Sequence, residues 1–368
     1  EYAVKAIALH GSAKALRLIE FYTRKYKTTY KNIGAAANES FELVAEELDI
    51  SPYDLADTIV PDFDFEGLFK SFEVSGETYR AFVNTDFKLV FLDESNKIIK
   101  SLPKETSPAL KEAFKDTAKE IKDLLKPQTT RLEQYLIIQR RWESSKWESL
   151  FRQNPVMFVY AVRIVWGAYS PDGNLLYTFR CEEDQSLVTI NGEEIEVDES
   201  LKIGLVHPIS LDTASIAYWS QNLLDAGITP VFPQLLRPVT LLNTNEQTLK
   251  MSNTFVGVES GGAAFLGKMT KSGWNKMVAD AGLISSYYKG FPQFGIIAFV
   301  EQTGMHGIGL YQENAVMGRV YFVKEIVIKP GAYYYDDPSS PGDPRLIPFG
   351  DVPPIMYSEV MADLQYFK

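Results

Sequence analysis

Residues 69–83, FKSFEVSGETYRAFV, mark the point at which the sequence changes its periodicity. Upstream, apolar residues recur every three or four positions, as on one face of a helix. From Leu68 onward they alternate with a period of two, which is typical of half-buried strands. Ser75–Gly76 separates two such runs, and KLVFLD and KIIKSL flank a second polar turn at 94–96. We therefore expect a small antiparallel meander over residues 63–105.

Upstream of the meander, residues 1–62 are expected to form a pair of helices. Ile33, Ala37, Phe41, Val44 and Leu48 recur at steps of four and three, which places them on one stripe. The segment 13–26 has a similar pattern. One helical pair cannot bury its own apolar face, so the pair is expected to be the end of a helical array.

Downstream, residues 106–368 mix helical and strand patterns, and we predict a larger body of helices and antiparallel strands. An apolar helix face runs from Leu110 to Leu125, and Pro127 is expected to open a second helix, where proline costs no hydrogen bond. Asn191–Gly192, between LVTI and EEIEV, is the strongest hairpin signal. Asp212 should cap a helix that Gly227 ends. Further elements are expected as a helix at 261–274, strands at 283–288, 295–300 and 318–323, and a final helix at 356–364. The fold class predicted for the whole chain is α+β.

The composition bounds the possible functions. The chain has 368 residues, a formal net charge of −11 and one cysteine, Cys181. A single cysteine allows no disulfide framework, which favours a reducing, cytoplasmic compartment. No apolar run approaches the roughly 20 residues of a membrane span. The acidic balance argues against broad nucleic-acid binding, because such binding relies on neutralising phosphates. The chain begins with neither a signal peptide nor a basic leader, so we expect the C-terminal part of a longer protein.

One segment deserves a test as a phosphate-binding loop. Gly262–Met269, GAAFLGKM, contains most of a GxxxxGK motif. That motif needs Ser or Thr after the lysine to bind magnesium, and Met269 cannot do so. The apolar AAFL also favours burial. We therefore predict a helix that includes Met269, with no phosphate-binding loop.

Other reactive residue types give no complete catalytic or metal motif. The three histidines lie far apart, and Cys181 falls on the apolar face of an expected strand beside two glutamates, which disfavours a thiolate. The tryptophans are expected mostly in the core. An acidic loop lacks the alternating oxygen ligands of a calcium site. The residues concerned are His10, His207 and His306, and, in the loop, Asp336, Asp337 and Asp343 with the tyrosines 333–335. No catalytic residue or metal site is therefore predicted, and the sequence leaves the identity of any cofactor open.

The segment FPQLLRP, residues 232–238, is the main candidate for a functional surface. Its two prolines stiffen the backbone, and its apolar residues should dock onto the body. Gln234 and Arg237 then remain to meet a partner. Arg237 either pairs within the fold as scaffold or, with His207 and Trp219, borders a pocket for an anionic ligand, which the planar guanidinium suits. These four residues form the predicted ligand-binding set.

Several long stretches carry a family resemblance. They include IGLVHPISL, TPVFPQLLRPV, ELVAEELDISPYDLADTIVPDF, RLEQYLIIQRRW and RIVWGAY with LLYTFRCEEDQSL. In these the chain resembles the C-terminal region of bacterial molybdate metabolism regulator (MolR)-like proteins, which often carry helical repeats and sometimes a WGR domain. No WGR signature is present in this sequence. The resemblance implies a regulatory role and assigns no catalytic residue.

Two functional hypotheses follow. The leading one is a non-catalytic regulatory or binding module at the C-terminus of a larger bacterial protein, with a protein or a small anionic ligand as partner. The alternative is an enzyme or sensor acting on a nucleotide or another anionic small molecule. The basic group His207, Arg237, Lys268 and Arg319 would supply its site. A bound phosphate or nucleotide would distinguish the two.

Overall fold

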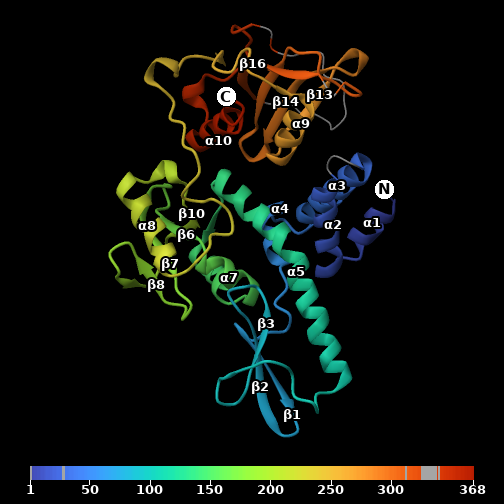
Figure 1. Ribbon diagram of the computed structural model, residues 1–368, viewed down its shortest axis with the longest axis vertical. Helices are drawn as coiled ribbons and strands as arrows, with labels where there is room; N and C mark the ends of the chain where they lie inside the picture. Colours follow the sequence, from blue (N-terminus) through green and yellow to red (C-terminus); the bar gives the residue numbers. More distant parts are fainter. Residues whose placement is uncertain (1, 27–29, 311–312, 325–337, 339) are drawn as a thin grey trace. The chain divides into compact units, whose positions relative to one another are not determined.

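The chain folds into two compact units, Glu1–Leu235 and Leu236–Lys368, in the computed structural model (Figure 1). The structure describes residues 2–26, 30–310, 313–324, 338 and 340–368. Both units combine helices with antiparallel strands, which confirms the predicted α+β class. The division after Leu235 falls inside the predicted 106–368 body, while the predicted boundaries at 62 and 105 stay predictions.

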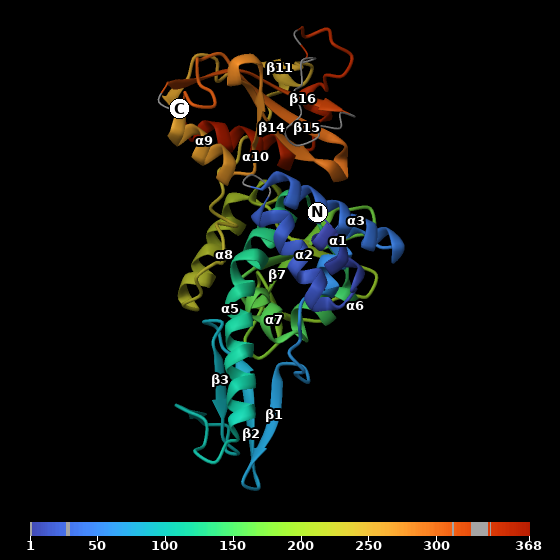
Figure 2. The same cartoon turned by 90° about the vertical axis from the view of Figure 1, so that its right-hand side faces the viewer.

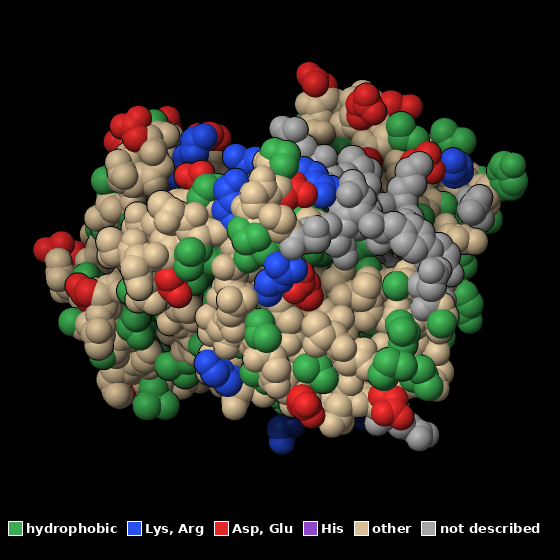
Figure 3. Space-filling model, turned by 90° about the horizontal axis from the view of Figure 1, so that it is seen from above, with side chains coloured by type: hydrophobic (Ala, Val, Ile, Leu, Met, Phe, Trp, Pro, Cys, Tyr) green, Lys and Arg blue, Asp and Glu red, His purple; other side chains and the backbone are tan. Residues whose placement is uncertain are grey.

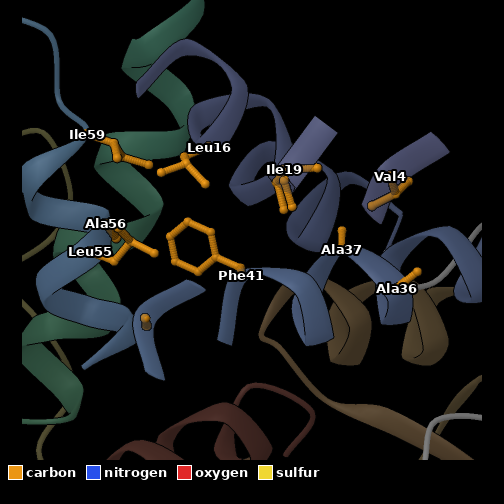
Figure 4. Packing of buried hydrophobic residues seen from close by; sticks show 11 residues of the cluster. Val4, Leu16, Ile19, Ala36, Ala37, Phe41, Leu55, Ala56 and Ile59 are labelled. Atoms are coloured by element: carbon orange, nitrogen blue, oxygen red, sulfur yellow. The ribbon is translucent and has the colours of Figure 1, made fainter. Parts of the chain in front are cut away.

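The first unit begins with four helices, α1 (Tyr2–Leu9), α2 (Ala13–Lys25), α3 (Lys31–Glu47) and α4 (Pro52–Thr58). The predicted pair corresponds to α2 and α3. Together the four helices bury a common apolar cluster, in which the ring of Phe41 lies among Leu16, Leu55 and Ala56 (Figure 4). Ser51 caps α4 by accepting a hydrogen bond from the Asp54 amide at 3.0 Å, and Pro52 occupies the first helical position.

The predicted meander is present as β1 (Phe69–Val74), β2 (Glu77–Val83), β3 (Leu89–Leu92) and β4 (Ile98–Ile99), paired in that order and all antiparallel. The long helix α5 (Pro108–Ile137) runs alongside it in both ribbon views (Figures 1 and 2). The Phe114 ring meets the rings of Phe72 and Phe91 edge to face, with centroids 4.9 and 5.0 Å away. This aromatic cluster fixes α5 on the meander.

The expectation that Pro127 opens a second helix is wrong, because α5 continues through it. Proline inside a helix loses one backbone hydrogen bond and costs about 3 kcal/mol. The turns that follow compensate by tertiary packing, since Arg131, Leu132, Tyr135 and Leu136 are all buried. Packing of these side chains therefore overrides the local preference of the proline.

A six-stranded sheet forms the centre of the first unit, with the order β5-β10-β6-β7-β8-β9. The expected hairpin at Asn191–Gly192 joins β8 to β9, and Asp212 caps α8 as predicted. All five tryptophans of the chain are at most 2% exposed, which confirms their expected place in the core. The elements are β5 (Arg141–Glu143), α6 (Ser144–Trp147), the π-helical turn η1 (Glu148–Arg152), α7 (Pro155–Val162), β6 (Val165–Tyr169), β7 (Leu175–Cys181), β8 (Leu187–Thr189), β9 (Glu194–Ile195), β10 (Lys202–Leu205), η2 (Pro208–Ser210) and α8 (Thr213–Asp225).

The second unit is built on another antiparallel sheet, with the order β11-β16-β15-β14-β13 and β12 paired to β16. The expected helix at Gly262 is present, and Met269 is fully buried in it, so Gly262–Lys268 forms no phosphate-binding loop. The expected strands and final helix are also found. The elements are η3 (Thr244–Glu246), β11 (Met251–Ser252), β12 (Glu259–Gly261), α9 (Gly262–Lys271), β13 (Asn275–Val278), η4 (Asp280–Gly282), β14 (Ile284–Phe291), η5 (Pro292–Phe294), β15 (Ile296–Gln302), β16 (Asn314–Lys324), η6 (Phe349–Asp351) and α10 (Pro354–Gln365).

The surface carries charges of both signs. On the face that Figure 3 presents, basic, acidic and hydrophobic side chains lie in small interspersed groups. Polyanion binding relies instead on a one-sided positive field. Within the part of the chain that the structure describes, no helix has the length and apolar character needed to cross a membrane.

Candidate functional site

Three of the four predicted ligand-binding residues lie in the core of the first unit. His207 is 1% exposed, and its Nδ1 accepts a hydrogen bond from the Ile209 amide at 3.1 Å. The Trp219 indole donates to the Thr178 hydroxyl at 2.8 Å. Gln234 bonds the backbone at the start of β6 and just after β10. Its Oε1 accepts from the Val165 amide at 2.9 Å, and its Nε2 donates to the carbonyl groups of Val165 and Val206 at 2.7 and 2.9 Å. The structure thus gives each of them a role in holding the fold together.

Arg237 belongs to the second unit and forms a buried ion pair with Glu359 on α10. Its Nε and Nη2 donate to the two carboxylate oxygens at 2.7 and 2.6 Å, a bidentate arrangement. The two side chains are only 12% and 6% exposed. Leu236, between the anchored Gln234 and Arg237, is 79% exposed, contrary to the expectation that it docks. Its neighbours Phe232 and Leu235 are buried as expected.

The other residues considered from the sequence also have structural partners. Lys268 lies over the Tyr366 ring at 4.1 Å, and Arg319 pairs with Glu301 at 2.6 Å. Burial raises the pKa of the Cys181 thiol to about 12 and keeps it protonated at neutral pH. His306 is buried against the Tyr287 hydroxyl, with 3.0 Å between Nε2 and the oxygen.

The acidic loop is described only in part. Asp343 binds Arg345 at 2.6 Å, whereas Asp336, Asp337 and the tyrosines 333–335 lie outside the described residues. No group of three potential metal ligands is found among the residues that the structure describes.

A polar network that the sequence did not reveal joins α4 to the segment after α5. The Asp57 carboxylate is 3% exposed and accepts from three side chains: Arg140 at 2.9 Å, the Trp142 indole at 2.8 Å and the Tyr135 hydroxyl at 3.1 Å. Asp54, one turn earlier, also receives Arg140 at 2.8 Å. The network therefore spans the predicted boundary at residue 62.

The Arg140 guanidinium is surrounded by aromatic rings as well as by carboxylates. The rings of Tyr53, Tyr135 and Trp142 lie 5.9, 5.7 and 5.6 Å from it, within the range of cation–π attraction. Burial raises the pKa of the Tyr135 phenol above its ordinary value, so this hydroxyl remains a donor to Asp57. These contacts hold Arg140 in one place.

Lys146 extends the network toward solvent. Its Nζ bonds Asp54, which also accepts from Ser51 and Arg140. Burial alone would raise the pKa of Asp54, but the hydrogen bonds from these three donors outweigh it and hold the pKa well below its ordinary range. Asp54 is therefore a fixed negative charge, and Lys146 is held beside it on α6.

A cavity of about 380 Å³ opens beside this network. That volume lies at the lower end of the range of small-molecule sites, about 300 to 1,000 Å³. Asp57 and Lys146 form one part of its lining. The rest comes from the end of α4 with the loop after it and from η1 with the two residues after it: Thr58, Val60, Asp62, Phe65, Gly67, Ser149, Leu150, Gln153 and Asn154. The lining is mainly polar, with a few apolar side chains.

Both of the facing segments have unusual backbones. Ser149 and Leu150 belong to η1, a π-helical turn, and such turns are rare and frequent at functional sites. In the opposite loop, Phe63 and Asp64 have φ angles of +58° and +57°. Two consecutive left-handed residues without glycine are strained, and such strain gathers at ligand and catalytic sites. This coincidence makes the cavity the candidate functional site.

Several polar groups at the cavity have capacity for a ligand. Among the residues that the structure describes, the side chains of Ser149 and Gln153 make no hydrogen bond. Asp62 uses one carboxylate oxygen to accept the Asp64 amide at 3.0 Å, which leaves the other available. Lys146 has three donors and spends one on Asp54. The cavity thus offers both donors and acceptors.

The sequence contained a partial signal for this site. Asp54 and Asp57 are three residues apart, which places both carboxylates on one face of a helix. Asp62 and Asp64 then follow in VPDFDFEG. The missing information was long-range, because Arg140 lies 83 residues beyond Asp57 in the chain.

The fold and the cavity describe an α+β chain with a polar site of small-molecule size. Residues 97–274 match a family described as "Domain of unknown function (DUF4132)". The chain is also 26% identical over 280 residues to "Uncharacterized protein YehI" of Escherichia coli (strain K12), an alignment that covers 72% of this chain and 23% of that protein. No solved structure matches the chain. These matches support the predicted resemblance only as far as a domain of unknown function. Nothing in them links the chain to molybdate.

Proposed function

We propose that this chain is a non-catalytic binding module whose cavity, beside Asp57 and Lys146, holds a small polar molecule. The observation that carries the proposal is the meeting of a ligand-sized polar cavity with two unusual backbone segments, η1 and the Phe63–Asp64 loop. Strained segments persist only when the surrounding structure holds them. Here Ser149 and Leu150 of η1 line the cavity, and so do Asp62 and Phe65, the residues on either side of the Phe63–Asp64 pair. Binding is therefore the role that this arrangement serves best.

Binding is favoured over catalysis by the state of the charged groups. Asp57 accepts from three donors, which leaves it poorly suited to take a proton from a substrate. Lys146 is ion-paired to Asp54 and is suited to hold a charge in position. An enzyme needs a nucleophile or base that is free to react. The cavity instead offers fixed charges and amides, which recognise and orient a ligand.

The proposed setting is a longer, cytoplasmic bacterial protein in which the module has a regulatory role. The proposal of a longer parent protein is supported by the length of the relative, because the alignment covers only 23% of that protein. Regulation rests on the resemblance to MolR-like proteins alone. The alternative, a nucleotide or other anion bound around His207 and Arg237, would require the anion to displace Glu359 from its bidentate pair.

Native mass spectrometry tests the proposed function. The chain is incubated with the polar fraction of a bacterial extract, exchanged into volatile buffer and examined for an added small mass. Ser149→Trp would fill the cavity, whereas Ser145→Trp, on the exposed side of α6, is the matched control. We expect the added mass with the unmodified chain and the control but not with Ser149→Trp. Binding that is equal in all three would exclude this cavity, and no added mass would refute the proposal.

A further inference from the structure

We infer that the ligand of this cavity is a zwitterion of the size of a free amino acid, with its ammonium group at Asp62 and its carboxylate at Lys146. The inference rests on the proposed function and specifies its ligand class. It depends on the charges that the network leaves uncompensated, on the spare donors of Lys146 and on the mixed lining.

The charges of the network balance one another, so Asp62 is the carboxylate at the cavity whose charge is not compensated by the network. Arg140 contacts both Asp54 and Asp57, and Lys146 contacts Asp54. These two cations and two carboxylates neutralise one another. Asp62 lines the same cavity, is exposed, and has no cation within ion-pair distance among the described residues. An ammonium group is the natural complement of such a carboxylate.

Lys146 can bind the negatively charged group of the ligand. Its side chain is 37% exposed, and its partner Asp54 is already stabilised by Arg140 and Ser51. Asp54 therefore keeps its charge while Lys146 shares its ammonium group with a ligand carboxylate. The uncommitted Ser149 hydroxyl and Gln153 amide can donate to the same group.

The remaining lining excludes simpler ligands. A bare anion would be repelled by the uncompensated carboxylate of Asp62, and a simple cation would leave the spare donors of Lys146 without an acceptor. Val60, Phe65 and Leu150 add an apolar part to the wall, suited to an aliphatic or aromatic side chain. A charge of each sign and an apolar side chain are the features of an amino acid.

Calorimetric titration of the 1–368 chain with each of the twenty amino acids tests the inference. The best binder is compared with its decarboxylated amine and its N-acetyl form. We expect at least one amino acid to bind and both modified forms to lose about tenfold or more in affinity, the equivalent of a charge-assisted contact. Asp62→Asn should weaken binding by a similar factor. Asp64→Asn, in the same loop but outside the lining, is the matched control, and thermal melting establishes that both variants fold.

The outcomes separate this inference from the proposed function. If the amine binds as tightly as its amino acid, the carboxylate is not recognised and the zwitterion is refuted, although the cavity still binds a ligand. The same holds if the N-acetyl form binds equally well. If no amino acid binds, the inference fails, and the mass-spectrometric experiment with Ser149→Trp decides independently whether the cavity holds another molecule.

Discussion

Two largely buried arginines, Arg237 and Arg140, with side chains 12% and 14% exposed, have very different surroundings in one chain. Arg237 meets one carboxylate, that of Glu359, in a bidentate pair. Arg140 shares two aspartates with Lys146 and the Trp142 indole and lies among three aromatic rings. The Arg237–Glu359 pair does not line the cavity, whereas the Arg140 network borders it through Asp57 and Lys146. An arginine alone therefore does not indicate a functional site. The site is indicated by neighbouring polar groups that still have hydrogen-bonding capacity for a ligand.

The largest effect should follow from Asp57→Ala. This change leaves Arg140 without its most buried carboxylate and removes the acceptor of the Trp142 indole and the Tyr135 hydroxyl. Breaking a buried ion pair costs about 3 to 5 kcal/mol, and we expect a loss of that size in the free energy of unfolding. Urea denaturation measures it, analysed for two transitions because the two units can unfold separately. Asp116→Ala, exposed on α5, is the control.

A loss below about 1 kcal/mol, the value of a surface pair, would mean that the Arg140 network contributes little. It would also favour the predicted boundary at residue 62, because the network is a major part of what joins α4 to the body, beside the bond from Arg131 to the Ala56 carbonyl. A large loss would instead indicate that residues 1–62 share their stability with the segment after α5.

Gln234→Leu should have the next largest effect. The substitution leaves the Val165 amide and the carbonyl groups of Val165 and Val206 without their side-chain partner in a buried position. Unsatisfied buried groups cost about 1 to 3 kcal/mol each, and partial relaxation should limit the total loss to about 2 to 4 kcal/mol. Thermal and urea unfolding measure it against Gln221→Leu on the exposed face of α8. Equal stability of the two variants would contradict the scaffold role of FPQLLRP in the first unit.

The third prediction concerns the pH dependence of the Asp54 interactions. The pKa of Asp54 is lower in the folded chain than its ordinary value. Its charge therefore stabilises the fold above the unfolded pKa of about 4, and this contribution is lost as the pH falls toward the folded value. Asp54→Asn should be less stable than the unmodified chain by about 1 kcal/mol at neutral pH, and the difference should narrow below about pH 4.

Urea unfolding over a range of pH values checks this narrowing. Asp86→Asn serves as the control, because Asp86 is 64% exposed and its variant should show almost no difference from the unmodified chain at any pH. A difference for Asp54→Asn that is the same in acid and at neutral pH would show that the Lys146 and Arg140 contacts do not depend on the charge of Asp54.

Local chemistry made much of the fold predictable from the sequence. Asn191–Gly192 and Asp212 act through their own backbone geometry, so the hairpin and the cap could be inferred without knowledge of their neighbours. Pro127 was misinterpreted because its cost is set locally, whereas its compensation comes from packing along the rest of α5. The fold class could thus be predicted from the periodicity of apolar residues. The continuity of α5 through Pro127 could not.

The candidate site was less predictable because it depends on distant pairs. Nothing near Arg237 indicates that Glu359, 122 residues later, satisfies its guanidinium. In the same way, nothing near Asp57 points to Arg140. The π-helical turn at Glu148–Arg152 contains no proline or glycine and reads as an ordinary helix. Residue type suggested which side chains could bind a ligand, but only the three-dimensional contacts show which of them are already occupied.

A similarly small effect is expected for Arg237→Lys, which tests the arginine that does not border the cavity. Lysine keeps the positive charge opposite Glu359 but cannot reproduce the two parallel hydrogen bonds of the guanidinium. We expect a loss of about 1 kcal/mol in the stability of the second unit, the value of one hydrogen bond. The small mass bound by the chain in native mass spectrometry should be unchanged, because Arg237 does not line the cavity. Loss of that ligand with stability preserved would mean that Arg237 takes part in ligand binding, contrary to the structural role inferred for it. A fall in stability with the ligand retained would establish FPQLLRP as a scaffold segment, fixed by Gln234 in the first unit and by Arg237 in the second.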